Sequence, residues 1–127
     1  MDFTFSDEQR QLVDAIDRHL DERHDLAQRR RIVHGPSGRS AALWHALAEM
    51  GVLMLPVSEA GGGFGGGAVD LIGPMAAIGR TLVVEPVLAT LVALRLVDRG
   101  GDDAQRASLA GVIDGSQGLV FAHTEAH

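Results

Sequence analysis

The sequence lacks cysteine and lysine, and aromatic residues make up only 4% of its 127 residues. Without cysteine, the chain can form no disulfide and no thiolate-ligated metal site. With so few aromatic side chains, its core must be built from Val, Leu, Ile and Ala. The formal net charge is −6, from 11 basic against 17 acidic residues. This acidity argues against a nucleic-acid partner, which would require clustered positive charge.

Long hydrophobic runs are also missing. A membrane-spanning helix needs about 20 consecutive apolar residues, whereas Asp70, Arg80, Glu85 and Arg95 interrupt the apolar stretches of this sequence. Residues 1–5 do not show the basic region and apolar core of a signal peptide. We therefore expect no membrane span and a cytoplasmic location.

Neither the histidines nor the basic run of the sequence indicates a binding site. His123 and His127 are four residues apart, but the pattern around them is not helical, so they do not form a zinc-helix motif. We predict no metal site. Arg29–Arg31 closely follows the acids Asp21 and Asp25, and such a mixture is typical of a solvated helix face.

Capping signals and apolar spacing predict helices over most of the chain. Ser6 followed by Gln9 forms a capping box, and apolar residues recur behind it at three- and four-residue steps up to Leu20. This first helix is expected to end between residues 26 and 32. Similar signals predict helices at residues 40–50, 70–82, 86–97 and 102–114. The predicted fold class is all-α, a bundle of about five helices with a C-terminal strand stub.

The segment 86–97 is apolar on nearly every side, with Arg95 as its only charge. Pro86 suits the first turn of a helix, where its missing N–H costs nothing. A helix that is hydrophobic all round must be covered all round. We therefore expect the other helices to surround this segment and to make it the centre of the fold.

Residues 61–67 contain six glycines around Phe64. Glycine-rich loops can cradle phosphate groups, but no Gly-Lys-Ser/Thr follows here and no strand clearly precedes the loop. A tight connector whose Phe64 fills a pocket is the favoured interpretation.

The chain changes character after Gly115. Residues 118–125 form a short apolar run that resembles a strand, and a lone strand has nothing to pair with in a helical domain. We predict a helical domain at residues 1–117 and, at residues 118–127, the first strand of a β domain outside this sequence. No arrangement of Ser, His and Asp or of paired carboxylates indicates a catalytic site.

Several motifs together resemble the N-terminal domain of acyl-CoA dehydrogenases. Each is weak alone, but their order and spacing along the whole chain are specific. They are Phe5–Arg10, Leu43–Trp44, Met50–Leu53, Ser58–Glu59, Gly61–Gly62, Gly79–Arg80 and Phe121–Glu125. The pimeloyl-CoA dehydrogenase small-subunit branch is the most similar, through Gln28–Val33, Gly65–Asp70, Val84–Thr90 and the terminal Phe-Ala-His-Thr-Glu run.

This resemblance implies a fold and an activity. Members of the family combine an N-terminal helical domain, a middle β domain and a C-terminal four-helix bundle, and the latter two hold FAD with a neighbouring subunit. They remove a proton from the α carbon of an acyl-CoA and pass the β hydride to the flavin. The chain looks like the first domain and the first strand of the second. The family's catalytic glutamate belongs to the C-terminal bundle, so no catalytic residue is assigned in this chain.

The resemblance also assigns a flavin-contacting segment. Phe121, His123 and Thr124 match its start. Family members continue with proline and a glycine-serine turn, whereas this chain has Ala126–His127. FAD is therefore expected in the complete enzyme, and this chain alone is not expected to hold it.

A second set of residues corresponds to the wall of the family's acyl-chain cavity. By resemblance, the substrate-binding residues are Val84, Val87, Leu88 and Leu91. Ordinary core packing is the alternative interpretation for each of them.

The resulting hypothesis is that the chain is the N-terminal part of a FAD-dependent acyl-CoA dehydrogenase that helps to wall the acyl-chain cavity. Its implied partners are an acyl-CoA substrate and other dehydrogenase subunits, in a homo- or hetero-oligomer. The alternative is a non-catalytic helical interaction or oligomerisation module of a flavoprotein dehydrogenase complex. A third possibility is an unrelated helical adaptor.

Overall fold

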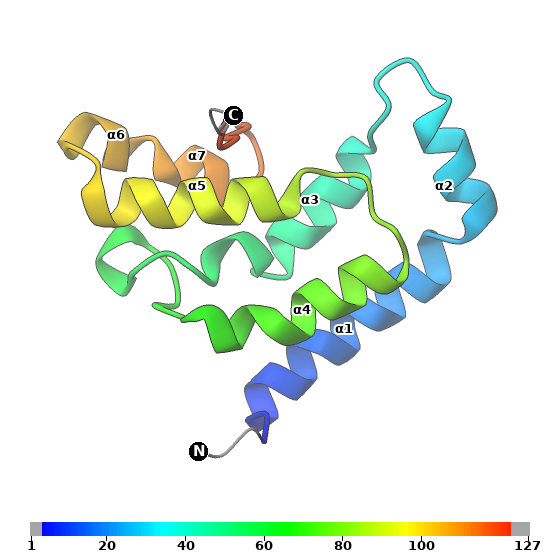
Figure 1. Cartoon of the computed structure of the whole chain (residues 1–127), viewed down its shortest axis with the longest axis horizontal. Helices are drawn as coiled ribbons and strands as arrows, with labels where there is room; N and C mark the ends of the chain where they lie inside the picture. The colour runs from blue at the N-terminus through cyan, green and yellow to red at the C-terminus, as the bar shows by residue number, and fades with distance from the viewer. Residues whose placement is uncertain (1–3, 123–127) are drawn as a thin grey trace, which may run out of the picture.

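A computed structural model describes residues 4–122, and these residues fold as a set of packed helices (Figure 1). The helices are α1 (Asp7–Arg23), α2 (Leu26–Val33), α3 (Ala41–Glu49), α4 (Ala68–Arg80), α5 (Val87–Gly100), α6 (Asp103–Ala107) and α7 (Leu109–Ile113), with short 3₁₀ turns η1 (Val52–Met54) and η2 (Glu59–Gly61). No strand occurs within residues 4–122. The predicted all-α class is confirmed.

The predicted C-terminal strand is only partly covered by the structure. Residues 118–122 have no regular secondary structure, and residues 123–127 lie outside the described part of the chain. The division at residue 117 therefore stays a prediction.

The first predicted helix is divided into α1 and α2. The capping box at its start is confirmed, because Gln9 N donates to Ser6 Oγ and Ser6 N donates to Gln9 Oε1. The break falls at His24, after which Asp25 accepts a hydrogen bond from Gln28 N and begins a new helix. Aspartate is among the preferred N-cap residues, so Asp25 starts a helix rather than continuing one.

Helices α1 and α4 run side by side in the lower part of Figure 1. Their close approach depends on Gly73, because a Cβ there would lie 2.5 Å from Val13 Cγ2. Pro74 follows inside α4, where it removes one backbone donor. The helix nevertheless runs from Ala68 to Arg80, so the proline neither delays nor divides it.

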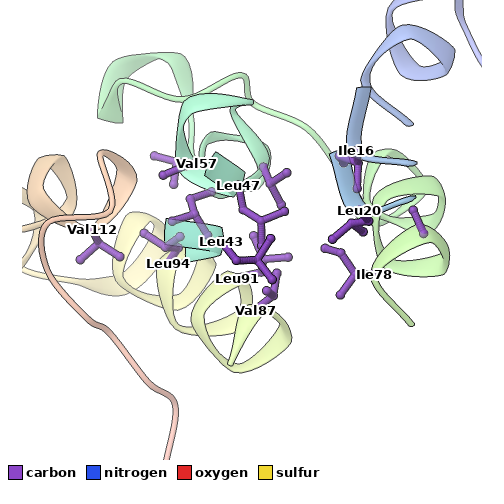
Figure 2. Packing of buried hydrophobic residues seen from close by; sticks show 14 of the residues in the cluster. Ile16, Leu20, Leu43, Leu47, Val57, Ile78, Val87, Leu91, Leu94 and Val112 are labelled. Atoms are coloured by element: carbon purple, nitrogen blue, oxygen red, sulfur yellow. The ribbon is translucent and has the colours of Figure 1, made fainter. Parts of the chain in front are cut away.

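The core joins this pair of helices to α3, α5 and α7. Figure 2 shows Leu43 and Leu47 of α3 facing Leu91 and Leu94 of α5, and each of these side chains is less than a tenth exposed. Ile16, Leu20 and Ile78 continue the same cluster between α1 and α4. The core is aliphatic, as the composition predicts.

The expectation that other helices cover residues 86–97 on all sides is wrong for one face. Leu88, Val92 and Leu96 of α5 are 58%, 38% and 51% exposed, whereas Leu91 and Leu94 are 1% and 0% exposed. The helix is therefore central to the core on one side only, and its opposite face is apolar and uncovered by residues 4–122.

Candidate functional site

The exposed side of α5 forms an apolar stripe. Leu88, Val92 and Leu96 follow one another at four-residue intervals, so they share one helix face. With a rise of about 1.5 Å per residue, this stripe extends over about 12 Å. Contiguous apolar surface of this kind is typical of a ligand-binding groove or an interface.

A groove of about 270 Å³ runs beside this stripe, between α5 and the start of α4. Leu71 of α4 and Leu91 of α5 line it together with Pro56, and Leu88 and Val92 are part of the same lining. Gly66 and Gly67 also line the groove and have no side chains to fill it. The groove can thus accept an apolar group between the two helices.

Arg95 lines this groove but does not direct its charge into it. Its Nη1 atom donates to the backbone oxygens of Pro56 and Gly66, both at 2.8 Å. These two bonds leave the aliphatic stem of Arg95 to complete the apolar wall. The arginine therefore fixes the edge of the groove rather than offering a charge to a ligand.

The start of α4 is fixed beside the groove by the carboxylate of Asp70. It accepts hydrogen bonds from Gly67 N at 2.7 Å and from Gln9 Nε2 at 2.6 Å. The Gly67 N–H and, to a smaller extent, the Gln9 amide lower the pKa of Asp70 from its ordinary value of 3.8. Asp70 thus joins α1, α4 and the glycine-rich loop at one point.

The glycine-rich loop has no backbone donors left for a phosphate group. Every N–H from Gly61 to Gly67 donates to an oxygen of the chain, for example Phe64 N to Met54 O at 3.0 Å and Gly65 N to Val57 O at 2.6 Å. Asp98 of α5 secures the beginning of the loop by accepting from Ser58 N and Ser58 Oγ. The loop is a connector, as the sequence indicates.

Phe64 is less enclosed than expected. Its side chain is 56% exposed, although its ring lies against Gly51 and lines a cavity of about 480 Å³ near the start of α1. The aromatic ring therefore covers part of a pocket without being buried in it.

The four predicted cavity residues occupy different environments. Val87 and Leu91 are 2% and 1% exposed and belong to the core, and Leu91 also reaches the floor of the groove. Leu88 is exposed on the stripe. Val84 is half-buried in the turn between α4 and α5 and is not part of the groove lining. The structure thus brings Leu88 and Leu91 together at the groove.

The turn before α5 is held by a buried carboxylate. Glu85 is 6% exposed, and its Oε1 atom accepts from Ser40 N, the N-cap of α3, at 2.7 Å. Glu85 also precedes the first turn of α5, where the helix dipole favours an anion. A smaller cavity of about 190 Å³ separates this region from residues 117–120. Thr90 Oγ1 donates to Leu119 O at 2.7 Å and fixes that segment against α5.

Of the predicted flavin contacts, only Phe121 belongs to the described residues. Its side chain is 42% exposed, and His123 and Thr124 lie outside the described range. The flavin-contacting role of these three residues therefore stays a prediction.

No group of three His, Asp or Glu side chains within residues 4–122 is arranged to hold a metal ion. In the same part of the chain, no helix combines the length and apolar character needed to cross a membrane.

Comparison with known families decides the assignment. The model of the family described as "Acyl-CoA dehydrogenase, N-terminal domain" matches residues 6–116, which is most of the chain. The chain belongs to the acyl-CoA dehydrogenase family. The family resemblance inferred from the sequence motifs is thereby confirmed. Comparison with curated proteins gave no match to this chain.

Two solved structures share this dehydrogenase fold. A variant of the Tcur3481–Tcur3483 steroid ACAD is 30% identical with a TM-score of 0.82, and the match covers 89% of this chain and 31% of that one. The ChsE4–ChsE5 complex from Mycobacterium tuberculosis is 22% identical with a TM-score of 0.73, covering 94% of this chain and 34% of that one. The dehydrogenase domain described here thus spans about a third of the solved chains that it matches.

Proposed function

We propose that this chain is the N-terminal helical part of a FAD-dependent acyl-CoA dehydrogenase and that the groove between α4 and α5 helps to wall the acyl-chain cavity. The observation that carries the proposal is the uncovered apolar stripe of Leu88, Val92 and Leu96 on a helix whose other side forms the core. An apolar face of this kind gains free energy when it is covered, at about 25 cal/mol per Å² of buried area.

The two kinds of predicted cavity residue would then act differently. Leu88 would contact the acyl chain directly, with Val84 in the adjoining turn. Val87 and Leu91 are fixed in the core, so they would set the position of α5, with Leu91 also forming the floor of the groove. The base that removes the α proton, and most of the residues that hold FAD, would come from outside this chain.

The complete dehydrogenase complex that contains this chain provides the test. We expect it to show flavin absorbance and to oxidise an acyl-CoA. Leu88→Trp should lower kcat/KM more for long acyl chains than for short ones, because the larger ring fills the groove. Ala104→Trp, at an exposed position of α6 outside the groove lining, is the control for adding a bulky surface side chain.

Two results would contradict the proposal. An equal loss of kcat/KM for all acyl-chain lengths in Leu88→Trp would show that the groove does not contact the acyl chain. A complex that contains the chain but shows neither flavin absorbance nor acyl-CoA oxidation would favour the non-catalytic interaction module. That alternative draws support from the solved relatives, which are named as assemblies of two proteins.

A further inference from the structure

A hollow of about 410 Å³ lies between α2 and α3 and is also lined by the end of α1, away from the groove. Its lining is polar and contains more basic than acidic side chains. The ionisable and hydroxyl-bearing residues that line it are His19, Arg23, His24, Ser40, His45 and Glu49. Glu49 is the only acid among them, and Arg23 is the lining residue that always carries a positive charge.

His24 gives this hollow an unused hydrogen-bonding group. The side chain is 4% exposed, and its Nε2 atom is buried without a hydrogen-bond partner among residues 4–122. Buried polar atoms are nearly always paired, and each exception requires an explanation. His24 also lines a second hollow of about 290 Å³ on the opposite flank of α2. With a hydrogen on Nε2, the His24 ring can donate to a ligand.

The segment 26–39, which contains α2 and supplies Gln28 and Ile32 to the hollow, is more basic than the rest of the chain. Residues 26–39 contain four arginines and no acid, a formal charge of +4, whereas the whole chain carries −6; the remaining residues therefore carry −10. The ion pairs found within residues 4–122 use Arg10, Arg80 and Arg106, so none of them neutralises this segment. Ala42, in the first turn of α3, also lines the hollow, and the first N–H groups of a helix have no partner within the helix.

Helix α2 packs only loosely on the rest of the described chain. It has eight residues and none of them is buried, and it stands apart from the other helices at the right of Figure 1. Arg29 Nε links it to Leu82 O at 2.8 Å. Isolated helices shorter than about 12–15 residues are marginally stable in water. A ligand between α2 and α3 would therefore stabilise α2 as well as bind to it.

We propose that the hollow between α2 and α3 is a binding site for a phosphate group. Arg23 would supply a permanent positive charge and His24 would donate through Nε2, with His19 and His45 completing the polar lining. A phosphate group could belong to a free anion or to a larger compound such as coenzyme A, and the two sources are distinguished below. This inference is independent of the proposed acyl-chain groove, because none of the residues of the hollow lines that groove.

Calorimetric titration of the full chain with inorganic phosphate and, separately, with coenzyme A tests the proposal. We expect saturable binding of at least one of them. Arg23→Gln should weaken it by about tenfold or more, since one charge-assisted contact is lost. Arg18→Gln is the matched control, because Arg18 is an exposed arginine of the same helix that does not line the hollow. Tighter binding of coenzyme A than of phosphate would identify the larger compound as the source.

Amide exchange provides a further readout. Ligand should slow amide exchange in residues 26–33. The proposal is overturned if wild type shows no saturable binding, or if Arg23→Gln and Arg18→Gln bind equally well.

Discussion

Leu91 and Leu88 lie three residues apart on α5, and truncating each to alanine measures which side of the helix supports the fold. Leu91 is 1% exposed, and Leu→Ala at buried sites costs about 2.7–5.0 kcal/mol, because transfer and cavity terms add. Leu88 is 58% exposed. Full burial of a leucine side chain stabilises the fold by about 1.5–3 kcal/mol. Because less than half of the Leu88 side chain is buried, we expect Leu88→Ala to cost about 1 kcal/mol. We expect the two losses to differ by about 2–4 kcal/mol.

Urea unfolding at 25 °C measures both losses. Trp44 is half-buried against the core, so its fluorescence reports loss of tertiary packing, and far-UV circular dichroism reports loss of helix. Coincident transitions and an unchanged m value would show that the free energies of unfolding are comparable. Leu96→Ala, at 51% exposure, should behave like Leu88→Ala. Equal losses for Leu88→Ala and Leu91→Ala would refute the assignment of a covered and an uncovered face.

Three further predictions concern the segments that border the groove. Asp70→Asn should destabilise the fold by about 1 kcal/mol at neutral pH through loss of its capping bonds. Because the pKa of Asp70 is lowered in the folded state, this difference is present above pH 3.8 and disappears as the pH falls through the folded-state pKa. Urea unfolding at several pH values checks this dependence. Gly63→Ala should destabilise by about 1–3 kcal/mol by overpacking, because its Cβ would lie 2.3 Å from Val57 O, and thermal unfolding measures the loss. Arg95→Met should keep the apolar wall but leave the two backbone oxygens without their hydrogen bonds. We expect faster amide exchange in residues 61–67 and little change in residues 10–20. Equal acceleration in both segments would contradict a local role for Arg95.

Local capping signals in the sequence predict much of the fold. The capping boxes of Ser6 with Gln9 and of Asp102 with Gln105 are both formed, because each needs only residues three positions apart. The break before α2 is different. Asp25 lies four residues before Arg29, a spacing that suits an ion pair within a continuous helix, and it also suits an N-cap. The sequence pattern alone does not choose between them, and the structure shows the N-cap.

The cover over α5 could not be predicted from its composition. Apolar residues on every side indicate that the helix is covered, but they do not say whether one chain supplies all of the cover. The roles of Arg95 and Asp98 were missed for a related reason, since both hold a loop about 30 to 40 positions earlier in the sequence. A single arginine in an apolar helix, together with a glycine-rich loop full of backbone oxygens, is the signal that could have indicated this contact.

The uncovered stripe on α5 also affects how the protein must be handled and produced. A row of exposed leucine and valine side chains binds other apolar surfaces without selectivity. We therefore expect newly synthesised chains to self-associate unless a binding partner covers the stripe first. Production together with a partner that covers the stripe should therefore yield more soluble protein than production alone. In the cell, assembly would likewise have to cover the stripe before the chains self-associate.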